Sequence, residues 1–266
     1  MAKRVISAVV LVLVLVPFLI IGGIPFTVLV SLLGILGLYE LLSIRATKKK
    51  FPLVMRLIAY CMVVFFIVTN SKAITFQYNL DYRIVSALVF IFLAPMVFIN
   101  DNKKYNLNDA LFLVGSVVFI GLSFNLLVIT RNFNIAYIIY LLLITTITDT
   151  FALFTGMLVG KHKLAPEISP KKTIEGAVGG TLMGTVVATL FYNTVISSTT
   201  PLVFVILITA MLSIVGQIGD LVFSAIKRYY GKKDFSDLIP GHGGILDRFD
   251  SLVFVILAFI LVLGII

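Results

Sequence analysis

The sequence predicts an all-α, polytopic integral membrane protein. Of its 266 residues, 60% are hydrophobic and only 12% are charged. The mean hydropathy is +1.14. Apolar runs near twenty residues recur along the chain, and this is the length that an α-helix needs to cross a bilayer. These three observations exclude a soluble globular protein.

The apolar residues gather in nine segments, which predict about nine transmembrane helices. They are residues 5–22, 24–44, 53–69, 84–99, 109–130, 135–156, 174–196, 201–223 and 251–266. The first segment follows Lys3 and Arg4, just as the apolar region of a signal peptide follows basic residues. However, it exceeds the roughly 7–15 apolar residues of such a peptide and no A-x-A-like site follows, so we expect a retained helix. Segments 53–69, 84–99 and 251–266 are short for a core of about 30 Å, and we expect them to be tilted or to begin in the interface.

The basic residues predict the orientation of these helices. When the segments alternate across the membrane, 18 of the 21 lysines and arginines fall on the side of the N-terminus. The other three are Lys72, Arg83 and Arg131. By the positive-inside rule, the N-terminus is cytoplasmic and the C-terminus is outside the cell. The formal charge of +9 therefore reports topology in a plasma (inner) membrane and indicates no nucleic-acid partner.

Polar chemistry is concentrated in the second half of the chain. Eight of the twelve acidic residues occur from Asp149 onward. We expect residues 1–140 to be scaffold helices with few polar groups beyond Glu40, and residues 141–266 to be the catalytic region of one integrated membrane domain. The cationic run at residues 45–50 is typical of a topology signal that contacts anionic lipid.

Residues 224–250 form the one long polar segment, and nine of these 27 residues are charged. Basic residues come first, acids follow, and a Pro-Gly-His-Gly-Gly turn precedes the last apolar segment. The positive-inside count places this segment in the cytoplasm. Such an order is more than a solvated connector needs, and it indicates a site for phosphates and a divalent metal.

Asp149 lies in the cytoplasmic half of the sixth segment, after a run of threonines. A carboxylate at this depth faces a cavity, a partner or a metal, because burying an isolated charge in the bilayer costs several kcal/mol. Hydrogen bonding to the neighbouring threonines is the alternative. Ala152, Gly156 and Gly160 follow at helical spacing, which indicates close packing against another helix.

Residues 169–180 form a second constellation. We expect Ser169 to cap a helix whose first turn begins with Pro170, so that Lys171 and Lys172 lie where free backbone N–H groups favour an anion. The alternative role of these lysines is to set topology. Gly176, Gly180 and Gly184 recur every four residues and are typical of helix packing.

The end of the eighth segment and the start of the ninth supply a third constellation. At 100° per residue, one helix face carries the side chains of Gln217, Asp220, Ser224, Lys227 and Arg228. Asp247 and Asp250 lie at the entrance to the ninth segment, three residues apart, and are therefore adjacent on a helix surface. Carboxylates from two separate elements suit magnesium, which also takes phosphate oxygens as ligands. The alternative for Asp247 and Asp250 is helix N-terminal charge complementarity, with pairing to Arg248.

His242 lies between glycines, where it could donate a hydrogen bond to a phosphate. With only His162 and Cys61 as further nitrogen or sulfur ligands, a zinc site is not indicated.

The polar segment resembles the signature of the phosphatidate cytidylyltransferases, also called CDP-diacylglycerol synthases, of the bacterial type. The matching residues are Ser224-x-Ile226-Lys227-Arg228, Lys233-Asp234-x-Ser236 and Ile239-Pro240-x-His242-Gly243-Gly244-Ile245-x-Asp247-Arg248-Phe249-Asp250. Asp149 and residues 169–180 resemble other recurrent blocks of that family, whereas the first 140 residues match only in hydropathy.

The resemblance implies a magnesium-dependent nucleotidyltransferase that joins CTP to phosphatidic acid and releases pyrophosphate at the cytoplasmic face. It implies Asp220 and Asp247 as metal ligands, and we expect Asp149 to be a further ligand. It also implies a second cation and a homodimer. We expect Lys227 and Arg228 to act in catalysis alongside these carboxylates. The residues expected to bind substrate are Lys171, Lys172, Ser224, Lys233, Asp234, His242, Arg248 and Asp250.

A membrane transporter or cation channel is the alternative function, because Asp149 and Asp220 could line an ion path. A transporter, however, would place polar residues near the midplane, whereas here they gather at one face. A lipid nucleotidyltransferase or kinase with another acceptor is a closer alternative.

Overall fold

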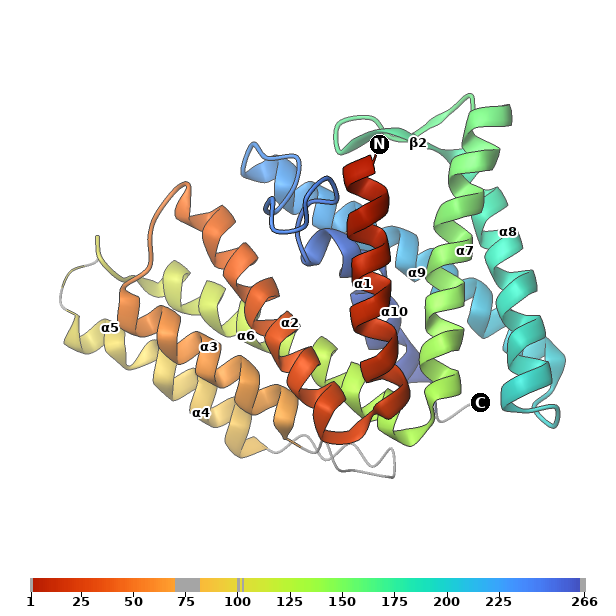
Figure 1. Cartoon of the computed structure of the whole chain (residues 1–266). Coiled ribbons are helices and arrows are strands. Elements are labelled where there is room, and N and C mark those ends of the chain that lie inside the picture. Colours follow the sequence, from red (N-terminus) through yellow and green to blue (C-terminus); the bar gives the residue numbers. More distant parts are fainter. Residues whose placement is uncertain (1, 70–81, 100, 102, 264–266) are drawn as a thin grey trace. The chain divides into compact units, whose positions relative to one another are not determined.

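The computed structural model describes residues 2–69, 82–99, 101 and 103–263, with side chains for all of these except 2–6 and 8. Lys72, one of the three basic residues assigned to the outer side, lies outside this range. The elements in chain order are α1 (Ala2–Ile21), α2 (Gly23–Ala46), α3 (Leu53–Val68), α4 (Tyr82–Leu93), α5 (Pro95–Phe98), α6 (Leu107–Phe133), α7 (Ile135–Val159), β1 (Lys163–Ala165), β2 (Ser169–Thr173), α8 (Ile174–Phe191), the π-helix η1 (Tyr192–Ile196), α9 (Leu202–Tyr229) and α10 (Leu246–Val262) (Figure 1).

The all-α membrane class is confirmed. Each predicted apolar segment coincides with a helix or with two consecutive helices. Within the described ranges, five helices are long and apolar enough to cross a membrane: α2, α6, α7, α8 continued by η1, and α9. Shorter apolar helices cover Val9–Ile21, Leu53–Val68 and Tyr82–Phe98. The number of crossings and their orientation stay predictions.

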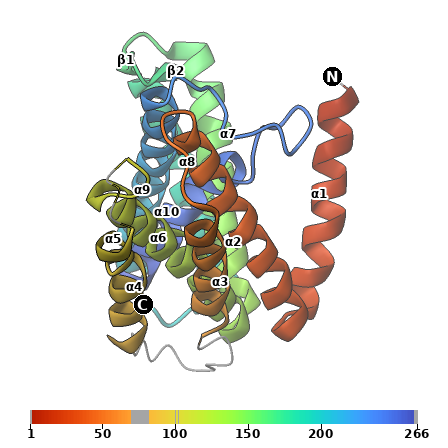
Figure 2. The ribbon, with the colours of Figure 1, turned by 90° about the vertical axis from the view of Figure 1, so that its left-hand side faces the viewer.

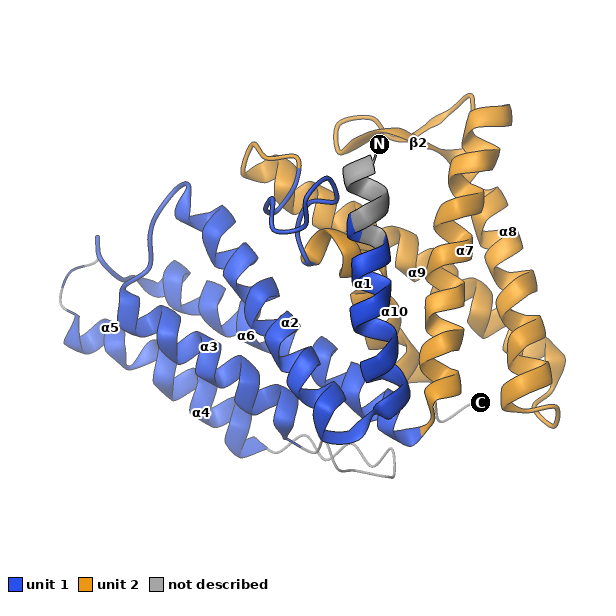
Figure 3. Cartoon of the chain, in the orientation of Figure 1, with its two compact units in different colours: residues 1–133, 234–245 blue, residues 134–233, 246–266 orange. Residues whose placement is uncertain are grey.

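The chain divides into two compact units, which Figure 3 distinguishes by colour. Unit 1 contains Met1–Phe133 and Asp234–Ile245, and unit 2 contains Asn134–Lys233 and Leu246–Ile266. A short stretch of the polar segment thus belongs with the N-terminal helices, although its chain neighbours on both sides belong to unit 2.

Unit 1 is built on α2, α3 and α6. Gly121 of α6 lets the helix approach α3, since a Cβ at this position would lie 2.9 Å from the Cβ of Phe66. The buried Asn125 amide donates to the carbonyl oxygens of Ile67 (2.8 Å) and Thr69 (2.6 Å) at the end of α3. Helices α1 and α2 meet near Gly22 and diverge from there, as Figures 1 and 2 show.

The cationic run at residues 45–50 has a structural role inside unit 1. Arg45 donates to Asp109 at 2.8 Å, and Lys49 donates to the other oxygen of the same carboxylate. The Arg45 guanidinium also lies over the rings of Phe51 (5.4 Å) and Phe112 (4.7 Å). These contacts join the end of α2 to the start of α6.

Unit 2 is built on closely packed α7 and α8, with α9 beside α8. A Cβ at Gly180 would lie 2.5 Å from the Thr148 carbonyl oxygen, and one at Gly176 would lie 2.6 Å from that of Ala152. The predicted packing role of these glycines is confirmed. The Gln217 amide of α9 then donates to Thr181 Oγ1 of α8 at 2.8 Å.

The predicted helix start at Ser169 and Pro170 is wrong. Residues Ser169–Thr173 form β2, which pairs antiparallel with β1, and α8 begins only at Ile174. Thr173 caps α8, because its side chain accepts a hydrogen bond from the Gly176 N–H at 3.1 Å. Pro170 is compatible with an edge strand as well as with a helix start. Lys171 and Lys172 therefore extend from a strand and not from the first turn of a helix.

Candidate active site

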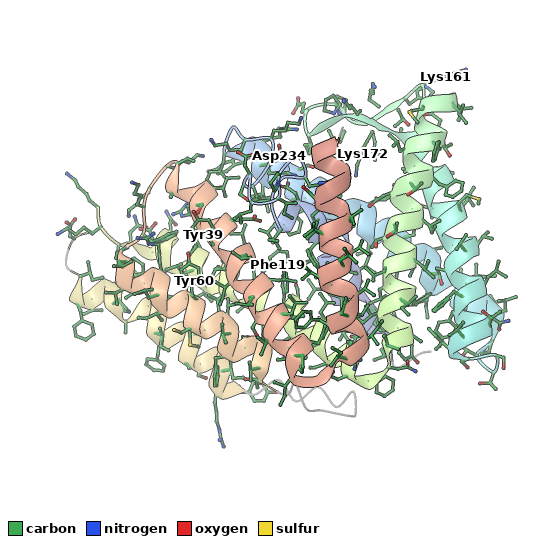
Figure 4. All side chains as sticks on the ribbon, in the orientation of Figure 1. Tyr39, Tyr60, Phe119, Lys161, Lys172 and Asp234 are labelled. Atoms are coloured by element: carbon green, nitrogen blue, oxygen red, sulfur yellow. The ribbon has the colours of Figure 1, made fainter. Side chains whose placement is uncertain are left out.

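Two lysine–aspartate ion pairs form the centre of the candidate site in unit 2. Lys172 of β2 donates to Asp220 Oδ2 of α9. Lys227 of α9 donates to Asp247 Oδ1 of α10 at 2.6 Å. The two pairs link three elements that are far apart in the sequence. Figure 4 labels Lys172 on the β-hairpin.

The two pairs differ in their exposure to solvent. The side chains of Lys227 and Asp247 are 9% and 3% exposed, whereas those of Lys172 and Asp220 are 28% and 24% exposed. Ser224 lies one turn after Asp220 and donates to Asp220 Oδ1 at 3.3 Å. The predicted polar face of this helix is thus confirmed for Asp220 and Ser224. A ligand can reach the Lys172–Asp220 pair more easily than the Lys227–Asp247 pair.

Two further carboxylates, Asp149 of α7 and Asp250 of α10, lie within range of electrostatic repulsion from Asp220. Lys172 attracts Asp149, and Lys227 attracts Asp250. Four carboxylates therefore share two lysines across these elements. When all are ionised, the cluster carries two more negative than positive charges.

This charge excess and the oxygen donors fit a divalent cation. Magnesium prefers carboxylate and phosphate oxygens and usually keeps several waters. Among the described residues, no three histidine, cysteine or acidic side chains gather closely enough to hold a metal by themselves. The donor set is therefore suited to a cation that arrives with, and is partly coordinated by, a phosphorylated substrate.

The other basic residues predicted to bind substrate or to act in catalysis in unit 2 lie at its surface. Lys171, Arg228, Lys233 and Arg248 are exposed. Arg228 donates to the carbonyl oxygens of Ile168 (3.3 Å) and Lys232 (2.8 Å). Its guanidinium therefore ties the end of α9 to the β1–β2 turn, a contact that the sequence did not indicate.

Asp234 and His242 belong to unit 1 (Figure 4 labels Asp234). His242 lies in a tight turn in which the Ile239 N–H donates to the Gly243 carbonyl oxygen at 2.8 Å. Gly241 and Gly243 have φ angles of 79° and 82°, which favour glycine. His242 Nδ1 is buried, and nothing in the described part of the chain forms a hydrogen bond with it. This nitrogen is consistent with the predicted contact to a phosphate.

The sequence interpretation missed a role for Glu40 of α2. Its side chain is fully buried, and its Oε1 accepts hydrogen bonds from Ser236 Oγ (2.6 Å) and from the Ile245 N–H (2.8 Å). One signal was present, because a glutamate within a long apolar segment needs a partner. The sequence, however, does not indicate that the partners are Ser236 and Ile245, about two hundred positions away.

Comparison with known proteins places this arrangement in a family. The model of the Cytidylyltransferase family matches residues 2–266. The chain belongs to the cytidylyltransferase family. The match covers the N-terminal helices too, which resembled the family only in hydropathy.

Individual relatives agree with this membership. The chain is 36% identical to the phosphatidate cytidylyltransferase of Bacillus subtilis (strain 168) over 258 residues, which are 96% of this chain and 94% of that protein. It is also 36% identical to the phosphatidate cytidylyltransferase of Staphylococcus haemolyticus (strain JCSC1435), over 96% of both chains. As a cytidylyltransferase, the chain is a membrane enzyme of the nucleotidyltransferase class, which confirms the predicted family and sets the transporter alternative aside.

Proposed function

We propose that this enzyme is a phosphatidate cytidylyltransferase, which converts CTP and phosphatidic acid into CDP-diacylglycerol and pyrophosphate. The observation that carries the proposal is the cluster of Asp149, Asp220, Asp247 and Asp250 with Lys172 and Lys227 in unit 2. Relatives named for this activity are similar over nearly the whole chain.

The chemistry requires positioning and charge neutralisation and no protein nucleophile. An oxygen of the lipid phosphate attacks the α-phosphorus of CTP in line with the bond to the β-phosphate. A new bond forms between the lipid phosphate oxygen and the α-phosphorus. The bond from the α-phosphorus to the bridging oxygen breaks, and pyrophosphate leaves with that oxygen and the electron pair. Fixed cationic groups accelerate such a step when they lie where negative charge develops.

We assign Asp220, Asp247 and Asp149 as ligands of a magnesium ion, with Asp250 contributing to the negative field that attracts it. When bound, the ion would neutralise triphosphate charge and act as a Lewis acid. A second cation is part of the proposal, because the carboxylates outnumber the lysines in the cluster.

The lysines of the two ion pairs are proposed to contact phosphates. An ammonium carries three donors, so Lys172 and Lys227 can hold an aspartate and a phosphate oxygen at the same time. Lys171, Lys233 and Arg248 are exposed and are proposed to bind phosphate oxygens farther from the reacting atoms. Asp234 and His242 are proposed as further substrate contacts.

The acyl chains would remain in the bilayer while the headgroup reaches the site. The excess of lysine and arginine on one side of the predicted topology supports a cytoplasmic site in the plasma membrane. We further propose that the enzyme forms a homodimer, which cross-linking in membranes would test.

The deciding experiment supplies purified protein in lipid nanodiscs with radiolabelled CTP, phosphatidic acid and magnesium. We expect labelled CDP-diacylglycerol and an equal amount of pyrophosphate, and we expect EDTA to abolish both. Diacylglycerol, lysophosphatidic acid and phosphatidylinositol phosphate serve as competing acceptors, and a preference for one of them would identify a different lipid substrate. Absence of any labelled lipid with several divalent metals would overturn the proposal.

A further inference from the structure

Glu40 is the most deeply buried acid among the residues described here, with no exposed surface, and it lies in a helix expected to be scaffold. Glutamate is almost never fully buried unless its carboxylate is paired. Hydrogen bonds join Glu40 to both ends of the Asp234–Ile245 segment, which belongs to the same compact unit as α2.

Two hydrogen bonds from Ser236 and Ile245 to Glu40 hold the two ends of this segment together, and we call this pair of hydrogen bonds the clasp. One oxygen, Oε1, accepts from Ser236 near the start of the segment and from the Ile245 N–H at its end. The backbone at Gly244 lies directly against the carboxylate, since a Cβ there would collide with the Glu40 oxygens. A single buried oxygen thus holds together residues that are nine positions apart.

The segment between these two contacts carries a proposed substrate contact. His242 lies in the turn that the Ile239–Gly243 hydrogen bond closes. Ile245 is the last residue before α10, whose first turn contains Asp247. The backbone positions of His242 and Ile245 therefore depend on how firmly the two ends of the segment are held.

We propose that Glu40 is a positioning residue for the cytidylyl transfer, and that it pre-forms the segment for nucleotide binding. This inference takes its substrate, CTP, from the proposed function. The hydrogen bonds of the clasp do not depend on that function. Hydrogen bonds to a carboxylate are roughly twice as strong as those to a neutral acceptor. A neutral side chain at position 40 should hold the segment less tightly, and CTP would then have to order it on binding.

The test compares Glu40→Gln with the wild-type protein and with Ser31→Ala as a matched control. Ser31 is also buried in α2, but within the described part of the chain its hydroxyl bonds only to the Thr27 carbonyl oxygen of the same helix. We expect Glu40→Gln to raise the KM for CTP about tenfold while kcat changes less than about threefold. Ser31→Ala should leave both unchanged. Partial unfolding would instead lower kcat at constant KM, and an unchanged KM for CTP would overturn the inference.

Hydrogen exchange measured by mass spectrometry separates the clasp from the chemistry. In Glu40→Gln without substrate, we expect faster exchange at amides 236–245 and unchanged exchange in α3 and α6. Unchanged exchange at amides 236–245 would refute the clasp whatever the activity. Absence of product with the wild-type enzyme would refute the proposed function and leave the exchange result standing.

Ser236→Ala is the second variant, and it decides the matter if Glu40→Gln does not fold. It removes one donor and keeps the Ile245 contact, so we expect a smaller rise in KM, about threefold. Ser236→Thr retains a hydroxyl and should restore most of the affinity. A threonine variant as poor as the alanine variant, or an alanine variant with wild-type KM and exchange, would contradict the role of Glu40.

Discussion

Two charged clusters of this chain use the same residue types to different ends. In unit 1, Arg45 and Lys49 surround Asp109, whose side chain is 1% exposed. In unit 2, Lys172 and Lys227 serve Asp220 and Asp247, with Asp149 and Asp250 in electrostatic range. The first cluster has more cations than carboxylates, and the second has fewer.

The difference separates a structural cluster from a candidate active site. Asp109 is saturated by two cations and by the Asn106 N–H at 3.1 Å, while Arg45 stacks on two rings. The unit 2 cluster keeps a negative excess that a divalent cation can neutralise. The balance of charge, more than the presence of charged residues, therefore indicates where chemistry occurs.

The largest effect should come from neutralising the carboxylates of unit 2. We expect Asp220→Asn and Asp247→Asn each to lower kcat at least about a hundredfold, because charge stabilisation of the transition state is lost. Formation of CDP-diacylglycerol at saturating substrates measures this loss. A thermal-unfolding comparison with wild type controls for folding. Near-wild-type rates in both variants would show that these residues are not metal ligands.

The matching change in unit 1 should alter stability and spare catalysis. Asp109→Asn leaves Arg45 and Lys49 without their carboxylate, so we expect the free energy of unfolding to fall by roughly 2 kcal/mol. The kcat of the folded fraction should stay within about twofold of wild type. Unfolding temperature and kcat measured on the same preparation test both statements. A large fall in kcat at unchanged stability would give this cluster a catalytic role.

A smaller effect is expected for the lysines of the candidate site. Lys227→Met and Lys172→Met each remove one proposed phosphate contact, and we expect kcat/KM to fall about tenfold or more. The loss should be greater for Lys227, because its pair with Asp247 is nearly excluded from solvent. Steady-state kinetics with varied CTP would reveal the order, and a greater loss for Lys172 would contradict it.

The smallest effect should come from Arg45→Lys. Lysine keeps the charge beside Asp109 but loses the planar stacking on Phe51 and Phe112, so we expect a loss of about 0.5–1 kcal/mol in stability. Lys50→Arg, at an exposed position of the same run, is the control and should be neutral. Equal unfolding temperatures for Arg45→Lys and wild type would argue against a stabilising role of the stacking.

The sequence predicted the helices well where hydropathy alone defines them. All nine apolar segments coincide with helices, because a chain in a bilayer must satisfy its backbone hydrogen bonds locally. Prediction failed at Ser169 and Pro170, where the same residues suit a helix start and an edge strand. The partner strand Lys163–Ala165 decided between these outcomes, and strand pairing has no local signal of comparable strength.

Within the candidate site, the helix face could be predicted from the sequence, whereas the contacts between elements could not. Asp220, Ser224 and Lys227 were predicted on one helix face because their spacing fixes it. The pairing of Lys172 with Asp220 is a contact across 48 positions, and no periodicity reports it. The Arg228 contacts with backbone carbonyls were likewise invisible, since every backbone offers the same acceptors.

Composition and spacing by themselves determined that this protein is an α-helical membrane protein with its polar residues gathered in the second half of the chain. These properties follow from hydropathy, charge and residue spacing, each of which depends on residues that are close together in the sequence. The resemblance of residues 224–250 to a family signature added the prediction of an enzyme. Only the tertiary structure decided that Glu40 holds the Asp234–Ile245 segment and that four carboxylates share two lysines. Both depend on which distant residues meet, and the burial of a carboxylate becomes tolerable only once its partners are in place.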